Sequence, residues 1–178
     1  MDRSILDWVT GNRPNWLVDV ATLLHHVGDD TVLVPATLVL IAVGYLTGRP
    51  SARTVAPFLT MVATVIVVGL AKIVFGRDRP PVALRLVETS SASMPSGHAA
   101  YAAALAGTAW VLLSGHPRRR LLRCVAGGRA AAAAGARVVL GVHWPSDIVV
   151  GGAPGGVIAA GGAQRPVHPR NSRAGKNK

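Results

Sequence analysis

The sequence predicts an all-α fold, an integral-membrane helical bundle with about five to six spanning helices. Half of the 178 residues are hydrophobic and only 15% are charged, so the charges must be concentrated between apolar segments. The apolar segments are long enough for helices and are separated by short basic or proline-rich loops. We therefore expect a single membrane-embedded domain over residues 1–163.

The first 30 residues are expected to lie at the membrane surface. Residues 1–15 are too polar to cross a bilayer, and residues 16–27 have apolar positions at helical spacing but include Asp19 and two histidines. We predict an interfacial amphipathic helix over 16–27, with a spanning helix as the alternative. His25 and His26 are adjacent and point to different helix faces, so they make a poor metal pair and are interpreted as interfacial histidines.

Five later segments are candidate membrane-spanning helices. They cover residues 31–46, 54–75, 99–113, 121–141 and 148–163. The second contains about 22 residues, or roughly 33 Å of helix, which is enough to cross the hydrocarbon core. The fifth is short and contains Pro154, and its glycines recur at four-residue spacing, which favours close helix packing.

The distribution of basic residues predicts how the helices are oriented. Arginines gather in the loops after the first and third spans, and residues 164–178 form a basic tail that we expect to be disordered and cytoplasmic. If the five spans alternate, all of these lie on the cytoplasmic side. Three other polar clusters, 72–80, 93–98 and 137–147, then meet at the extracytoplasmic face of a multi-pass cell-membrane protein.

The formal net charge of +11 is compatible with nucleic acid or with anionic lipid. We favour lipid and expect no nucleic-acid partner, because the basic residues adjoin apolar runs and do not alternate with aromatic side chains. The single cysteine, Cys124, excludes an intrachain disulfide and a multi-cysteine metal site. The N-terminus lacks the apolar region of a secretory signal.

The cluster 93–98 has the pattern of a helix entrance that binds anions. Pro95 suits a first helical turn, Ser96 supplies a hydroxyl, and Gly97 lets a ligand approach unpaired backbone N–H groups. His98 places an imidazole beside them. Alone, this string is more often a simple helix-entry turn, so its interpretation depends on the other two clusters.

Together the three clusters predict a phosphate site. They supply the cations Lys72, Arg79 and Arg137, the hydrogen-bond donors Ser96 and Gly97, and the titratable residues His98, His143 and Asp147. Several fixed cations can hold the charge of a phosphoryl group without a metal, and arginine binds phosphate oxygens through two N–H groups at once. The alternative for each cation singly is an interaction with lipid headgroups.

His143 and Asp147 are four residues apart, so the carboxylate can fix the imidazole tautomer and leave the other ring nitrogen as a nucleophile. His98, from another helix, could protonate a leaving oxygen and later activate water.

These motifs resemble the type 2 phosphatidic acid phosphatases, which share their site with vanadium haloperoxidases and glucose-6-phosphatase. The family pattern is a lysine, six residues and Arg-Pro, then Pro-Ser-Gly-His, then Ser-Arg, five residues, His, three residues and Asp. Lys72 with Arg79-Pro80, the string 95–98, and Arg137, His143 and Asp147 match it. Ala136 stands in place of the usual serine, which removes one possible hydrogen bond to phosphate.

The resemblance implies a metal-independent enzyme without a cofactor. His143 would be the nucleophile that forms a phosphohistidine, Asp147 its orienter, and His98 the acid and then the base. Lys72, Arg79, Arg137, Ser96 and Gly97 would form the phosphate pocket. One of the family's six usual spans is missing unless residues 16–27 provide it.

The expected substrate is a lipid phosphate, for which we favour a polyprenyl-linked phosphate or diphosphate of cell-envelope synthesis. The alternatives are phosphatidic acid and phosphatidylglycerol phosphate. Alternatives from other classes are a catalytically silent lipid-phosphate-binding scaffold and a vanadate-dependent haloperoxidase. The intact His98, His143 and Asp147 argue against the scaffold, because binding alone needs no nucleophile.

Overall fold

The computed structural model describes residues 1–28, 52–112 and 117–153, together with single helical positions at 35, 38, 42 and 46. The predicted first span, apart from those positions, and the predicted tail 164–178 lie outside the described residues.

The described part of the chain is all-α, as predicted. Its elements are α1 (Asp2–Gly11), α2 (Asn15–Val27), α4 (Ala52–Phe75), the short 3₁₀ turn η1 (Val82–Leu84), α5 (Gly97–Leu112) and α6 (Arg119–Val139), followed by a helix over 145–153. No strand occurs among these residues. The predicted interfacial segment 16–27 is therefore helical, and the predicted fourth span corresponds to α6.

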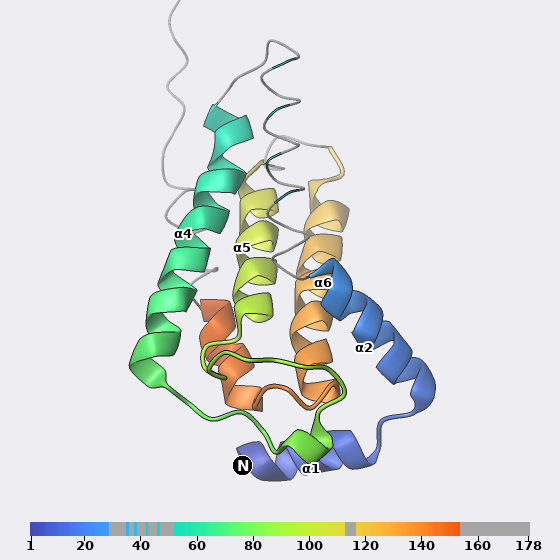
Figure 1. The fold of residues 1–178 in the computed structure, drawn as a ribbon. Coiled ribbons are helices and arrows are strands. Elements are labelled where there is room, and N and C mark those ends of the chain that lie inside the picture. The colour runs from blue at the N-terminus through green and yellow to red at the C-terminus, as the bar shows by residue number, and fades with distance from the viewer. Residues whose placement is uncertain are drawn as a thin grey trace, which may run out of the picture.

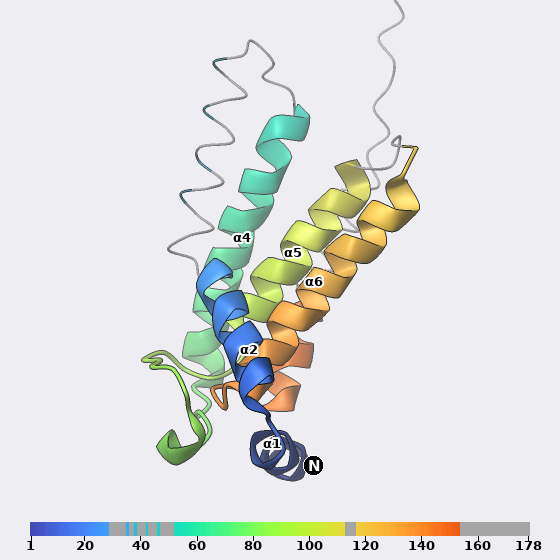
Figure 2. The same ribbon diagram turned by 90° about the vertical axis from the view of Figure 1, so that its right-hand side faces the viewer.

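The long helices α4, α5 and α6 lie side by side, with α5 packed against both of its neighbours (Figure 1). Helix α2 packs against α6, and α1 lies across one end of the bundle, where Figure 2 views it nearly along its axis. The turn η1, the loop before α5 and the helix 145–153 gather at the same end. This end of the bundle carries all three predicted clusters.

Helix α4 contains the predicted second span. Its segment Phe58–Phe75 is the one stretch of the described residues that is long and apolar enough to cross a membrane. Large apolar side chains such as Ile73 and Val74 are 80% exposed, so they face outward from the bundle. Apolar surface of this extent is typical of a lipid-facing helix. The predicted number of spans stays a prediction.

The helix 145–153 packs closely against the start of α5. A Cβ at Gly151 would lie 2.5 Å from the carbonyl oxygen of Ser96, so no larger residue fits there. The prediction that glycine permits close packing in this segment is confirmed at Gly151. Gly152 faces open space, and the glycines beyond it lie outside the described residues.

The turn after α6 depends on Gly141. Its φ is +69°, which disfavours side chains with a Cβ, and a Cβ here would lie 2.2 Å from the carbonyl oxygen of Leu84. Arg13 links the same region, because its guanidinium donates to the carbonyl oxygens of Val139 at 2.6 Å and Leu84 at 3.1 Å. The last turn of α6 is thereby satisfied by a side chain from the N-terminal segment.

Replacing Gly141 with alanine should lower the free energy of unfolding by more than about 2 kcal/mol, because the added methyl group meets backbone that cannot move aside easily. The matched control is Gly135→Ala in α6, where a Cβ meets nothing within 4 Å. It should leave stability unchanged or raise it by about 0.5–1 kcal/mol. Denaturation of the detergent-solubilised variants measures both, and equal stability of the two would contradict the prediction.

Candidate active site

A polar cavity of about 310 Å³ lies at this end of the bundle and draws residues from α2, α4, α5 and α6. Its lining residues are His25, Lys72, Arg79, Glu88, Thr89, Ser90, Ser91, Gly97, His98, Tyr101, Arg137 and His143. All of the predicted site residues except Ser96 and Asp147 are among them. A larger cavity of about 580 Å³ is formed by residues 82–90 and is lined by none of the predicted residues, so we place the site in the smaller one.

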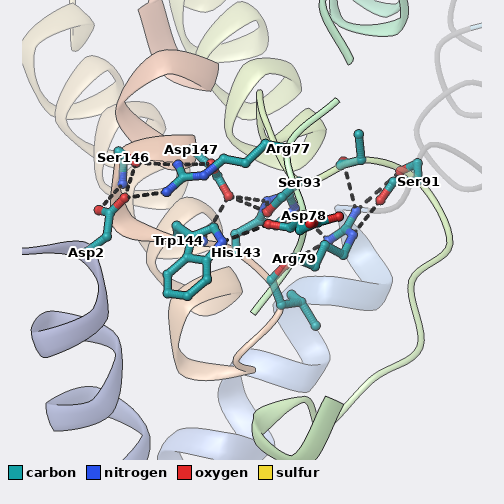
Figure 3. Close-up of polar contacts among 12 residues, drawn as sticks. Asp2, Arg77, Asp78, Arg79, Ser91, Ser93, His143, Trp144, Ser146 and Asp147 are labelled. Carbon is teal, nitrogen blue, oxygen red and sulfur yellow. Dashed lines mark hydrogen bonds and ion pairs between the residues drawn. The ribbon is translucent and has the colours of Figure 1, made fainter. Parts of the chain in front are cut away.

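The imidazole of His143 is oriented by Asp147. Oδ2 of Asp147 lies 3.4 Å from Nδ1 of His143 and accepts a 2.9 Å hydrogen bond from the backbone N–H of Trp144. Both side chains are buried. On the other side of the ring, Nη1 of Arg79 lies 3.2 Å from Nε2 (Figure 3). Because arginine can only donate, Nε2 is the nitrogen that carries the lone pair.

The surroundings keep His143 neutral and Asp147 ionised. Burial lowers the pKa of His143 to about 4, helped by Arg79 and Arg137 and opposed by the hydrogen bond to Asp147. Burial alone would raise the pKa of Asp147, but hydrogen bonds from His143, Ser93 and the Trp144 backbone bring it below its usual value. At neutral pH the pair is therefore an imidazole with a carboxylate, which is the form a nitrogen nucleophile needs.

Backbone carbonyls hold two of the predicted cations. The Nε of Arg79 donates to the carbonyl oxygen of Ser91 at 2.7 Å and its Nη1 to that of Val142 at 2.8 Å. Burial lowers the pKa of Arg79 to about 10, so it remains charged at neutral pH. The Nζ of Lys72 donates to the carbonyl oxygen of Ala92. The loop before α5 thus orients both cations at the cavity.

The helix entrance differs from its prediction in two details. Helix α5 begins at Gly97, and Pro95 lies outside it after a cis peptide bond. Ser96 is fully buried; its N–H donates to the carbonyl oxygen of Asp147 at 3.1 Å, and its hydroxyl has no partner among the described residues. Gly97 lines the cavity, whereas Ser96 connects α5 to the helix 145–153.

Arg77 and Ser93 belong to the site, although only their neighbours were predicted. Nη1 of Arg77 donates to Oδ1 of Asp147 at 2.7 Å, and the hydroxyl of Ser93 donates to Oδ2 (Figure 3). Asp2 of α1 extends this network, because it accepts from Nη2 of Arg77 at 2.7 Å and from the N–H of Ser146 at 3.1 Å. Arg77 and Ser93 fall inside the predicted clusters, whereas nothing in the sequence pointed to Asp2.

His25 requires a correction. It was interpreted as an interfacial histidine, but it lines the cavity, and its Nδ1 lies 2.6 Å from Nη1 of Arg137 and 3.2 Å from Nε2 of His98. The reason is the packing of α2 on α6, which turns this face of α2 toward the site. His26, the next residue, is exposed. Within residues 1–28, 52–112 and 117–153, no group of histidine, cysteine, aspartate or glutamate side chains has the arrangement of metal ligands.

The low pKa of His143 predicts a pH-dependent stability. The unfolded chain protonates this imidazole near pH 6.5, but the folded protein does so only near pH 4, so stability is lost as pH falls between these values. The loss should reach about 3 kcal/mol at pH 4. The ionised Asp147 adds its own loss only below about pH 4.

Melting temperatures of the wild type and of His143→Asn, measured from pH 7 to pH 4, test this. The wild type should lose stability more steeply than the variant, which keeps a donor toward Asp147 but cannot titrate. Parallel curves would show that His143 titrates normally in the folded protein.

Comparison with known proteins gives one family and two structural relatives. The family model described as the PAP2 superfamily matches residues 53–167. A crystal structure described as the first transmembrane PAP2 type phosphatidylglycerolphosphate phosphatase, from Bacillus subtilis, is 28% identical with a TM-score of 0.79, and the match covers 89% of this chain and 81% of that one. A crystal structure of LpxE from Aquifex aeolicus is 22% identical with a TM-score of 0.70, over 88% and 91% of the two chains. No curated protein matches the chain.

These matches confirm the predicted family and its enzyme class, a PAP2-type lipid phosphatase. The transmembrane relative and the apolar helix α4 also agree with the predicted membrane association. The similarity to LpxE supports the fold. Because the family model covers well over half of its length and all three of its motifs, the chain belongs to the PAP2 superfamily.

Proposed function

We propose that the chain is a metal-independent phosphatase that hydrolyses the phosphate ester or diphosphate of a membrane lipid through a phosphohistidine at His143. The observation that carries this proposal is the buried His143–Asp147 pair, whose Nε2 holds the lone pair and faces Arg79 at the cavity. A binding scaffold would need the cations but not an oriented neutral imidazole. The active site is proposed to open at the extracytoplasmic face.

The proposed reaction has two steps. Nε2 of His143 attacks phosphorus, the bond from phosphorus to the lipid oxygen breaks, and His98 gives that oxygen a proton. Water then attacks the phosphohistidine, His98 takes the water's proton, and inorganic phosphate leaves with the phosphorus–nitrogen bond broken. Lys72, Arg79, Arg137 and the N–H of Gly97 would hold the equatorial oxygens in both steps.

A third cavity supports a lipid substrate. It measures about 260 Å³, and His98 lines both this cavity and the polar one. Apolar side chains of α2, α5 and α6, most of them alanines, form the rest of its wall, together with Arg129. An apolar chain attached to a phosphate at His143 could lie here, since the groove begins at the residue that would protonate the leaving oxygen.

Two classes of lipid are candidate substrates. The first, which the sequence favours, is a polyprenyl-linked phosphate of cell-envelope synthesis. The relative from Bacillus subtilis is described as a phosphatidylglycerolphosphate phosphatase, which favours a glycerolipid as the second candidate. Phosphate release by the purified protein, assayed in EDTA with polyprenyl phosphate, polyprenyl diphosphate, phosphatidic acid and phosphatidylglycerol phosphate, would rank them.

The phosphohistidine can be trapped directly. Brief incubation with a ³²P-labelled lipid phosphate and a denaturing alkaline quench should leave base-stable, acid-labile label on the wild type. His143→Ala should carry none and should lose activity by about 10³-fold or more. His26→Ala, a change at an exposed residue, should behave like the wild type. Phosphate release by His143→Ala at the wild-type rate would end the enzymatic proposal.

The chain of contacts from Asp147 to Arg77 and Asp2 predicts losses of kcat that become smaller with distance from His143. Arg77→Gln removes the cation at Oδ1 of the buried carboxylate, so the His143 ring loses its fixed position and kcat should fall about tenfold to a hundredfold. Asp2→Asn weakens the ion pair with Arg77 and the contacts of Asp2 with Ser146, all of which lie further from His143, and should cost less. Arg3→Ala, which breaks an exposed pair with Asp7, is the matched control and should leave kcat unchanged. A full loss with Asp2→Asn, or none with Arg77→Gln, would contradict this order.

A further inference from the structure

The last turn of α2 holds one edge of the His98 ring. Nε2 of His98 lies 3.2 Å from Nδ1 of His25 and 3.2 Å from the carbonyl oxygen of the same residue. Next along the chain, a Cβ at Gly28 would lie 3.2 Å from Cδ2 of His98, so the ring packs directly against the end of the helix. The Nε2–Cδ2 edge of His98 is therefore in contact with α2.

The contacts of His25 determine where the proton on His98 resides. Nη1 of Arg137 lies 2.6 Å from Nδ1 of His25, and because arginine can only donate, this Nδ1 is an acceptor. Nε2 of His98 thus faces two acceptors, the His25 carbonyl oxygen and Nδ1 of His25, whose single lone pair also accepts from Arg137. A nitrogen between two acceptors must carry the hydrogen, so the neutral ring is the Nε2–H tautomer.

We propose that His25 is a positioning residue of the phosphatase site: its Nδ1 and carbonyl oxygen keep a proton on Nε2 of His98, so that Nδ1 of His98 gives a proton to the leaving oxygen and takes one from water. This inference rests on the proposed function. It assigns to His25 the role for His98 that Asp147 has for His143.

The two orienting partners differ in charge. Asp147 is a carboxylate, whereas both acceptors on His25 are neutral and orient the ring without adding negative charge that would hold the imidazolium. The end of α2 also presents its carbonyl groups, which weakly favour positive charge nearby. An acid that must later act as a base gains from a partner of this kind.

Titratable and charged groups of several described elements face this region. Among the described residues they are His25 of α2, with the exposed His26 beside its ring, Lys72 of α4, Glu88 of the loop, Tyr101 of α5, and Arg129 and Arg137 of α6, with His143 across the cavity. A pH profile of turnover would mix their effects. Dependence on the leaving group isolates the role of His98, because only this residue is proposed to protonate the departing oxygen.

The experiment measures the single-turnover rate of phosphohistidine formation with two substrates. One is the lipid phosphate that the wild type hydrolyses best, whose alkoxide needs a proton to leave. The other is p-nitrophenyl phosphate, whose phenolate leaves without one. In His25→Ala the rate with the lipid should fall about tenfold, because the carbonyl oxygen remains, and the rate with p-nitrophenyl phosphate should change less than about twofold.

Two further variants sharpen the test. His25→Asn places an amide oxygen near the position of Nδ1 and should restore most of the lipid rate, whereas His26→Ala should match the wild type throughout. If His25→Ala does not fold, Gly28→Ala replaces it. The φ of −92° at Gly28 is compatible with alanine. The added methyl group would lie 3.0 Å from the carbonyl oxygen of Leu24 and 3.2 Å from Cδ2 of His98, so it presses on the ring and the same leaving-group dependence is expected.

The outcomes separate the explanations. If His25→Ala slowed both substrates equally, His25 would act through Arg137 on phosphate binding, and the proposal would be overturned. Wild-type rates in both His25→Ala and Gly28→Ala would also overturn it. If His143→Ala lost activity with both substrates while His25→Ala kept wild-type rates, this inference would fail and the proposed function would stand. No hydrolysis by the wild type would overturn the proposed function itself.

Discussion

The buried carboxylate of Asp147 is the group on which the arrangement of this end of the bundle depends. A buried charge is costly unless donors surround it. Its donors come from three separate segments: Arg77 after α4, Ser93 before α5, and Trp144 with His143 after α6. Satisfying one carboxylate therefore fixes three loops relative to one another. At the same end of the bundle, Gly151 allows the helix 145–153 to approach Ser96, and Gly141 allows the turn after α6 to approach Leu84.

The two histidines of the site are held by different means because they come from different elements. His143 follows α6 and is oriented by a carboxylate one turn further along its own chain, at a spacing that the sequence displays. His98 lies in the first turn of α5 and is contacted by α2, a helix more than 70 positions earlier in the chain. Local spacing therefore predicted the first pair, whereas the second depends on how α2 packs.

The sequence predicts contacts that depend on local spacing and does not predict contacts that depend on how distant helices pack. Apolar length predicted α4, and motif spacing predicted the residues that meet at the cavity. Arg77 and Ser93 were missed as functional residues because their neighbours, Arg79 and Ser96, fit the motif better. Ser96 was predicted at the phosphate because helix entrances expose their donors, but the contact with Gly151 buries it. The N-terminal region gave no signal for Asp2, since a carboxylate on a surface helix is usually solvated.

Arg77 pairs with Asp147, whereas backbone carbonyls contact Lys72 and Arg79, and this difference affects the positive charge of the cavity. Backbone carbonyls orient Lys72 and Arg79, and a carbonyl dipole positions a cation without cancelling its charge. Asp147 would neutralise one of them if it turned toward the cavity. Instead Arg77 pairs with Oδ1 of this carboxylate, at 2.7 Å, while Oδ2 faces Nδ1 of His143. Arg77 therefore offsets part of the negative charge of the carboxylate that orients the nucleophile, so that Asp147 opposes the cations of the cavity less strongly.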